Sequence, residues 1–329
     1  MGQWADGGPL GHWATRLNIV QTPGFVMDTL RSLFSVETLF SAFSVQTTTR
    51  YGQPHIPHAL RGRSADEVGV TRLPDSDSNV GWDVVRVLSI VKAWSLASIF
   101  CNVLVSSHGY RGEVLEDAVY FRSRSPETGL ITVMAHTSEF DPGNITILMS
   151  PKIVAFPRLL RYTVAAEDQL FTTLPSSYYF QSLKVLPVTR GGGVDQDNLL
   201  RVIDKLDQGG WVELFPEGRI SMTPGVPLLP IRPGVGRLIA EAKVPPMVIP
   251  IYSEGMEKAK PPDLAPNIGK DIHVHVMVGD PIDLSSVLDE CAVESVGKHE
   301  CWRMLADAIY DAMLELRGQL RKRKADDGF

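Results

Sequence analysis

A strand, a helix and a second strand follow one another with short connections between residues 182 and 215, and this order restricts the fold more than any other feature of the sequence. SLKVLPVT (182–189) and WVELF (211–215) are apolar runs of strand length. Between them, Leu199, Val202 and Leu206 recur at helical spacing, and a Gly-Gly pair closes the helix. Such a unit predicts two strands that pair in parallel, and hence an α/β fold.

Further segments of the same kinds follow from about residue 107 onwards. GLITVMAH (129–136) and PPMVIPIY (245–252) predict strands, and GVGRLIAEAK (234–243) predicts a helix. A last helix is expected from about 297 to 324, because apolar residues recur every three or four positions, at Trp302, Leu305, Ile309, Met313, Leu316 and Leu320. Its basic end, RKRK, is explained either by the helix dipole or by a contact with anionic lipid headgroups.

The stretch 272–278 alternates Ile and Val with His273, His275 and Met277. This alternation predicts a strand with one buried face and with both histidines exposed on the other. We expect two solvent-facing side chains here rather than a pair of metal ligands. The three cysteines also lack metal-ligand spacing, and an odd, sparse set predicts reduced thiols at Cys101, Cys291 and Cys301. We therefore expect no metal site.

The bulk composition is that of a globular protein, with 44% hydrophobic and 21% charged residues among 329. The net charge of −6 argues against a nucleic-acid partner, because such partners require a basic surface. Residues 1–81 form an N-terminal extension of uncertain structure, in which the stretch 10–60 has few acidic residues. This bias indicates either a targeting or membrane-contacting segment or an ordinary extension packed on the domain.

Residues 82–106 are strongly apolar and precede the α/β region at 107–329. Arg86, Lys92 and Asn102 interrupt the segment, and cations inside a membrane-spanning helix are costly unless they reach the interface. We therefore expect a helix that lies along one leaflet of a membrane. A single spanning helix and a buried core helix remain open alternatives.

His136 directly follows the predicted strand 129–136, and Asp141 comes five residues later in MAHTSEFDPGN. Open α/β sheets build their sites at the carboxyl ends of strands. A histidine there can act as a general base, and a nearby carboxylate can fix its tautomer and stabilise the imidazolium. By itself this spacing is weak evidence, since a surface histidine near a capping aspartate has the same pattern.

Two more strand ends carry residues suited to binding. Phe215-Pro216-Glu217-Gly218 follows the strand WVELF, and Glu217 could accept hydrogen bonds from a substrate hydroxyl. Arg190 follows SLKVLPVT and precedes three glycines and a helix start at Asp195, an arrangement typical of phosphate binding. Taken together, a base, a phosphate-binding arginine and a hydroxyl-binding glutamate predict acyl transfer onto a hydroxyl of a phosphate-bearing lipid.

The ordered set ITVMAHTSEFDP, VLPVTRGGGVDQ, GGWVELFPEGRISM, GVGRLIAEAKVPPMVIPIY and VMVGDPID resembles the glycerophospholipid acyltransferases. The resemblance spans about residues 82–320, and AWSLAS at 93–98 falls where that family binds the membrane. It is strongest to members that exchange acyl chains between phospholipids and lysophospholipids and remodel cardiolipin in mitochondria. Pro142 is a departure, because a second aspartate usually follows the first in those members.

The resemblance implies that His136 is the base and Asp141 its orienting partner. It assigns phosphate binding to Arg190 and acceptor binding to the turn Phe215, Pro216, Glu217 and Gly218. It also implies phospholipid and lysophospholipid substrates, no cofactor, and a peripheral or monotopic place on a mitochondrial membrane, facing the intermembrane space. An acyl-CoA-dependent lysophospholipid acyltransferase and a non-catalytic lipid-binding protein remain alternatives. The sequence leaves the oligomeric state unknown.

Overall fold

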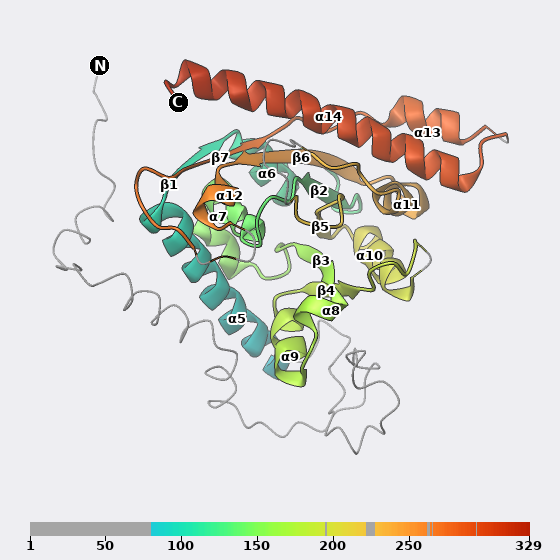
Figure 1. The fold of residues 1–329 in the computed structure, drawn as a ribbon. Coiled ribbons are helices and arrows are strands. Elements are labelled where there is room, and N and C mark those ends of the chain that lie inside the picture. Colours follow the sequence, from blue (N-terminus) through green and yellow to red (C-terminus); the bar gives the residue numbers. More distant parts are fainter. Residues whose placement is uncertain (1–79, 195, 222–227, 262–263, 265, 294) are drawn as a thin grey trace, which may run out of the picture. The chain divides into compact units, whose positions relative to one another are not determined.

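A seven-stranded sheet forms the centre of the computed structural model (Figure 1), which describes residues 80–329 except 195, 222–227, 262–263, 265 and 294. The strand order is β1-β7-β6-β2-β5-β3-β4. The strands are β1 (Ser106–Tyr110), β2 (Leu130–Met134), β3 (Tyr162–Ala166), β4 (Val185–Val188), β5 (Trp211–Leu214), β6 (Met247–Glu254) and β7 (His273–Val278). Only the β6–β7 pair is antiparallel among them, so the expected mixed, mainly parallel sheet is confirmed. The expectations for residues 1–79 lie outside the described residues.

The strand–helix–strand unit is present as β4, α10 (Asp197–Asp207) and β5, but its two strands do not pair with each other. β3 lies between them and pairs in parallel with both. The predicted direct pairing is therefore wrong, although the parallel direction is right. β3 and β1 escape prediction because β3 is only half-buried along its length and β1 (SSHGY) is polar.

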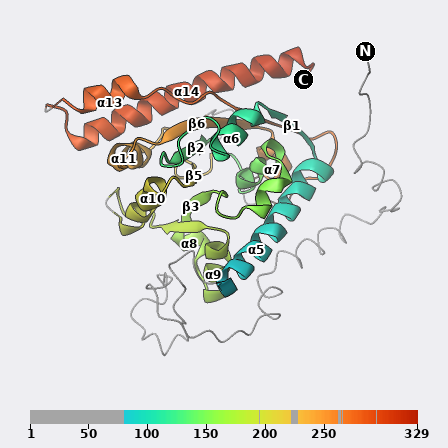
Figure 2. The same ribbon diagram turned by 180° about the vertical axis from the view of Figure 1, so that it is seen from behind.

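Helices cover both faces of the sheet, and both views place α14 on one side and α5 on the other (Figures 1 and 2). One layer packs on the core that contains Leu130 and Met134 of β2, the other on the core that contains Ile131 and Val133. β2 is thus buried on both faces, as a central parallel strand is. The first layer contains α5 (Val80–Ile99), the π-helical turn η2 (Phe100–Leu104), α6 (Gly112–Val119), α7 (Ile145–Leu148), η4 (Pro151–Ala155) and α12 (Met256–Ala259).

The second layer contains α10, α11 (Gly234–Glu241), α13 (Ser285–Cys291) and α14 (Lys298–Asp326). The predicted apolar stripe of α14 is confirmed, since all six of its residues are buried. At its basic end, Arg321 and Lys324 each donate a hydrogen bond of 2.8 Å to Glu254 of β6. The remaining short elements are η3 (Asp141–Asn144), α8 (Glu167–Leu170) and α9 (Leu174–Ser182).

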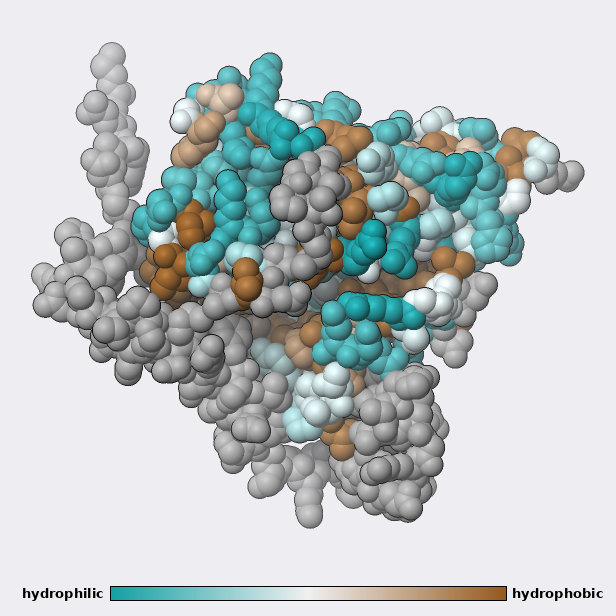
Figure 3. Space-filling model, in the orientation of Figure 1, coloured by the Kyte–Doolittle hydropathy of each residue, from teal (hydrophilic) through white to brown (hydrophobic). Residues whose placement is uncertain are grey.

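The apolar segment predicted at 82–106 forms α5 and η2 and ends where β1 begins. It is long and apolar enough to cross a membrane, yet one side of it packs on the domain through buried residues such as Ile90, Trp94 and Phe100. The other side exposes apolar residues at helical spacing, namely Val84, Leu88, Val91, Ile99 and Val103. On the face shown in Figure 3, apolar residues gather on the left, where Figure 1 shows the C-terminal end of α5.

Two expectations about single residues are wrong. Cys291 and Cys301 form a disulfide with Cα atoms 5.2 Å apart, because α13 and α14 fold back on each other and bring the two residues together. Cys101 is a buried free thiol, as expected. His275 is 2% exposed and His273 is half-buried, because β1 and the end of α14 cover the side of β7 that the alternation pattern predicts to be solvated.

Candidate active site

The predicted site residues lie along the carboxyl ends of the four parallel strands β2, β5, β3 and β4. His136 follows β2, and the turn Phe215–Gly218 follows β5, the neighbour of β2. Parallel neighbours end at the same edge of a sheet, so these two segments meet there. The sheet topology therefore brings together residues that are about 80 positions apart in the sequence.

The imidazole of His136 lies against the carboxylate of Asp141. The distance from Nδ1 of His136 to Oδ2 of Asp141 is 3.1 Å, and the aspartate side chain is fully buried while 18% of the histidine side chain is exposed. An imidazole whose Nδ1–H donates to a carboxylate has Nε2 as its free, basic nitrogen. The predicted pair is thus assembled, with its basic nitrogen available to a substrate.

Asp141 is held in place by the segment between the two residues. The backbone N–H groups of Thr137 and Ser138 donate hydrogen bonds of 2.6 and 2.7 Å to Oδ2 of Asp141. The five-residue spacing closes this turn, because Asp141 starts η3 and its own N–H donates to the carbonyl of Ser138. These hydrogen bonds fix the position of the carboxylate that His136 contacts.

The turn after β5 lies against the same imidazole. The ring of Phe215 stacks on His136, with ring centroids 4.3 Å apart. Gly218 has a positive φ of 68°, which closes the turn through a 2.9 Å hydrogen bond from its N–H to the carbonyl of Phe215. A Cβ atom at Gly218 would come within 2.6 Å of Nε of Arg232, so a larger residue would also have to displace this side chain.

Glu217 of this turn points into the protein rather than toward solvent. Its Oε1 accepts a 2.8 Å hydrogen bond from the N–H of His136, and its Oε2 accepts one of 2.7 Å from the N–H of Leu229. Burial raises the pKa of Glu217, and the two N–H donors act in the opposite direction. Both carboxylate oxygens therefore fix the backbone under the imidazole, and Pro216 beside it is buried as well.

Arg190 is the predicted site residue that lies apart from the others. It follows β4, the edge strand, which is three strands from β2 and hence about 14 Å across the sheet. Its side chain is 47% exposed, and its Nε lies 3.6 Å from Oδ1 of Asp168. A solvent-accessible cation at the same edge as His136 can reach a charged group of a substrate that spans this edge.

A buried ion pair behind the site is a feature that the sequence analysis did not identify. Nε of Arg161 donates a 2.6 Å hydrogen bond to Oε2 of Glu213, and Nη2 donates one of 2.6 Å to the carbonyl of Pro142. Glu213 is completely buried, and burial raises its pKa while Arg161 lowers it. A glutamate inside the apolar strand WVEL was the available signal, since a buried carboxylate requires a cationic partner.

The arrangement brings together an imidazole paired with a carboxylate, an aromatic wall and a hydrogen-bonded backbone, which together suit chemistry on a substrate hydroxyl. The chain need not supply a nucleophilic side chain, because the hydroxyl of the acceptor attacks once its proton moves to Nε2 of His136. Among the described residues, no group of three histidine, cysteine or carboxylate ligands forms at this edge of the sheet.

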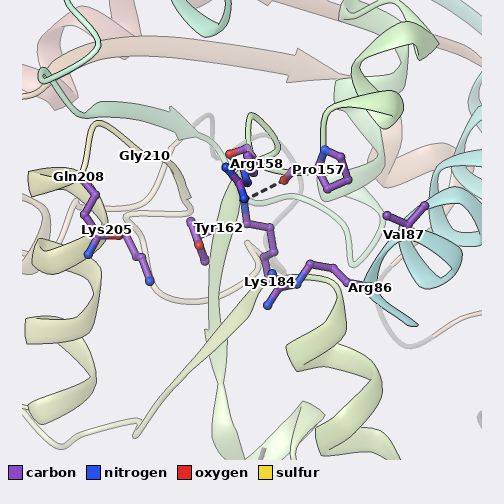
Figure 4. A pocket seen from close by; sticks show the side chains of 9 residues that line it. All are labelled: Arg86, Val87, Pro157, Arg158, Tyr162, Lys184, Lys205, Gln208 and Gly210. Carbon is purple, nitrogen blue, oxygen red and sulfur yellow. Dashed lines mark hydrogen bonds between the residues drawn. The ribbon is translucent and has the colours of Figure 1, made fainter. Parts of the chain in front are cut away.

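A basic cavity of about 500 Å³ lies at the opposite ends of the strands (Figure 4). Its lining includes Arg86 of α5, Arg158, Lys184 before β4 and Lys205 of α10, and the described lining residues include no acid. Figure 4 shows the side chains from these different elements around Tyr162. Nζ of Lys184 lies over the ring of Tyr162, 4.1 Å from its centroid. The cavity is therefore suited to an anionic group.

Comparisons with known proteins agree with this chemistry. The family model Acyltransferase matches residues 117–254, which contain His136, Asp141, Arg190 and Glu217. Tafazzin of Drosophila melanogaster is 30% identical over 74% of this chain and 67% of its own length. The protein named Taffazin of Dictyostelium discoideum is 35% identical over 60% of this chain and 70% of its own length. N-acylphosphatidylethanolamine synthase of Arabidopsis thaliana is 31% identical over 68% of this chain and 82% of its own length.

Proposed function

The chain belongs to the acyltransferase family that includes the tafazzins, and on this premise we propose that it exchanges fatty acyl chains between a phospholipid and a lysophospholipid. The observation that carries the mechanism is the 3.1 Å contact between Nδ1 of His136 and the buried carboxylate of Asp141. The substrates proposed are cardiolipin and monolysocardiolipin, following the resemblance to the tafazzins. The reaction requires no acyl-CoA and no cofactor, because the donor lipid already carries its acyl group as an ester.

In the proposed reaction, Nε2 of His136 takes the proton from the free hydroxyl of the lysophospholipid. The hydroxyl oxygen attacks the ester carbonyl of the donor phospholipid and forms a tetrahedral intermediate. The C–O bond to the donor glycerol then breaks, and the imidazolium returns its proton to the departing oxygen. Asp141 stabilises the imidazolium between the two transfers, and a new phospholipid and a new lysophospholipid are released.

We assign phosphate binding in this reaction to Arg190. Its exposed guanidinium lies at the same sheet edge as His136, and a guanidinium binds phosphate oxygens through two parallel hydrogen bonds. Phe215 stacks on His136 and limits how the imidazole can turn. Glu217 and Gly218 support the backbone of this wall. In this proposal Glu217 is a positioning residue, since both of its oxygens bind backbone N–H groups.

We also propose that the protein attaches to one leaflet of a mitochondrial membrane, on the side of the intermembrane space, through α5. The exposed apolar stripe of α5 supports a helix lying in the interface, because the other side of the helix is already packed on the domain. The basic cavity supports an anionic membrane surface, since Arg86 and Val87 at the start of α5 line it. Protease protection in intact and outer-membrane-ruptured mitochondria tests the compartment.

A vesicle assay with purified protein tests the reaction. It contains a labelled lysophospholipid and an unlabelled diacyl phospholipid, with and without acyl-CoA, for the wild type, His136→Ala and the control His299→Ala. His299 lies on α14 against Trp302, outside the site. We expect exchange without acyl-CoA in the wild type and the control, and none in His136→Ala. Activity only with acyl-CoA would assign the chain to the CoA-dependent branch, and exchange in His136→Ala would refute the mechanism.

A second acceptor is worth including in the same assay. The similarity to N-acylphosphatidylethanolamine synthase favours an amine as acceptor, and this relative is matched over 82% of its length. His136 can take a proton from an ethanolamine headgroup as well as from a hydroxyl. Phosphatidylethanolamine as the labelled acceptor would then yield an amide, which resists the mild base that cleaves esters.

Vesicle flotation tests the role of α5. Leu88→Glu with Val91→Glu places two charges on the exposed stripe, where the side chains are 47% and 42% exposed. We expect vesicle binding to fall at least about tenfold, because each charge opposes entry into the acyl region. Leu200→Glu is the matched control, since Leu200 is 48% exposed on α10. Equal binding by the wild type and the double variant would refute the attachment through this stripe.

A further inference from the structure

Three histidines meet on β1 and β7, at the sheet edge opposite β4, and one of them is distant from the other two in the sequence. His108 lies directly across from His275 in the parallel β1–β7 pair. His273 precedes His275 by two residues on β7, so both side chains project from the same face of the strand. Two histidines at positions i and i+2 and a third on the neighbouring strand therefore share one face of the sheet.

The ring nitrogens of these histidines are close enough for one ion. Each histidine offers one ring nitrogen to the cluster, and these three nitrogens lie within 4.8 Å of one another. Nε2 of His108 lies 3.2 Å from Nδ1 of His273. Tetrahedral zinc holds nitrogen ligands at 2.0–2.1 Å, which places two of them about 3.4 Å apart. The first pair already has this spacing, and small ring rotations bring the third nitrogen to it.

The cluster is largely closed to solvent and has an aromatic ring against it. His275 is buried, and the ring of Phe329 lies against all three imidazoles with centroid distances of 4.6, 5.0 and 4.8 Å. Neutral imidazoles retain the lone pairs that bind transition metals.

We propose that His108, His273 and His275 form a binding site for a divalent transition metal, with zinc as the preferred ion. Three imidazole ligands suit zinc, copper and nickel rather than magnesium or calcium, which prefer oxygen. Three protein ligands leave one tetrahedral position for water or for a carboxylate.

This site is separate from the acyl-transfer site and goes beyond the proposed function. β6 lies between β7 and β2, and His136 is placed at the end of β2 rather than within a strand. A metal at the cluster ties β1 to β7 beneath the end of α14. In the structure the rings of His108 and His275 are stacked with an angle of 14° between their planes, so metal binding tilts them to bring their nitrogens together.

Metal binding to the full-length chain in detergent tests the proposal. The protein is treated with a chelator and dialysed against zinc or cobalt, and the bound metal is counted by mass spectrometry. The variants are His273→Gln and His275→Gln, with His299→Gln as the control. A second control, His12→Gln with His55→Gln and His58→Gln, removes the histidines of residues 1–79. Circular dichroism checks that each variant is folded.

We expect one zinc per chain in the wild type and in both controls. The affinity for zinc should fall at least about 100-fold in each cluster variant, which is more than the usual effect of replacing a residue that only orients a ligand. Cobalt in the wild type should give the visible absorption of a tetrahedral site. Zinc should raise the melting temperature of the wild type but not of His273→Gln. Binding that is absent from the wild type, or unchanged in folded His273→Gln, would overturn the proposal.

Discussion

Two sets of histidines among the described residues lie in different environments, His136 at the end of β2 and His108, His273 and His275 on the β1–β7 pair. His136 contacts a buried carboxylate, and that carboxylate is fixed by two backbone N–H groups. The histidines of the β1–β7 pair contact one another and an aromatic ring, with Nε2 of His108 3.2 Å from Nδ1 of His273. A carboxylate orients an imidazole and stabilises its cation, whereas clustered imidazoles disfavour that cation.

The difference shows that the groups a histidine contacts, rather than how deeply it is buried, indicate whether it is suited to proton transfer or to metal binding. Both environments are partly closed to solvent. At the end of β2, one nitrogen is occupied and the other is free, which suits the transfer of a proton. On β1 and β7, several ring nitrogens face one another, which suits a shared ion. Variants of Asp141, of the residues that support the His136 site and of Glu254 on β6 should therefore differ in effect, from the largest to the smallest.

Replacement of Asp141 by Asn should produce the largest effect on activity. The amide keeps the shape of the carboxylate but removes the charge that stabilises the imidazolium and fixes its tautomer. We expect the acyl-exchange rate to fall about 10³- to 10⁴-fold, as in other histidine–aspartate pairs. Nitrogen NMR of labelled histidine should show a changed tautomer at His136. A loss of less than tenfold would show that Asp141 only supports the turn.

Removal of the guanidinium behind the site should produce the largest effect on stability. Arg161→Met leaves the fully buried Glu213 without its cation and frees the carbonyl of Pro142 next to Asp141. We expect the free energy of unfolding to fall by about 3–5 kcal/mol. Urea unfolding measures it, and Arg161→Met with Glu213→Leu is the matched control. If the double variant is no more stable than the single one, the uncompensated charge is not the cause.

Replacement of Glu217 by Gln should have a smaller effect on both properties. The carboxylate accepts from the N–H groups of His136 and Leu229, and an amide offers only one acceptor oxygen to these two donors. One buried N–H then faces an NH₂ group, which costs about 1–3 kcal/mol of stability. We expect the exchange rate to fall far less than in Asp141→Asn. A rate loss equal to that of Asp141→Asn would instead indicate direct contact with substrate.

Most of the fold and the pairing of His136 with Asp141 could be predicted from the sequence, because both depend on local patterns. Apolar runs followed by His136 or by Phe215 predict strand ends, and parallel strands place such ends at one edge. The direction of Glu217 was not predictable, because it depends on where Leu229 passes. The burial of His275 and the disulfide of Cys291 were also missed, since both depend on how α14 folds back over the sheet.

The pH dependence of the contact between Glu254 of β6 and α14 should give the smallest effect. Burial of Glu254 raises its pKa, but hydrogen bonds from Lys324 and Arg321 outweigh burial, so its pKa is lowered overall from the ordinary 4.5. The folded state therefore binds this proton less readily than the unfolded state, and the stabilisation is present above about pH 4.5 and lost as the pH falls through the lowered value.

Glu254→Gln removes this contribution at neutral pH, and we expect a loss of about 1–2 kcal/mol, since the side chain is 18% exposed and its hydrogen bonds are charge-assisted. Urea unfolding of the wild type and the variant at pH 7 and at pH 3 measures the difference. The two proteins should differ at pH 7 and converge at pH 3. Zinc binding at pH 7 should persist in the variant, because Glu254 is not among the proposed ligands. A difference in stability that is the same at both pH values would show that the charge of Glu254 does not hold α14 against β6.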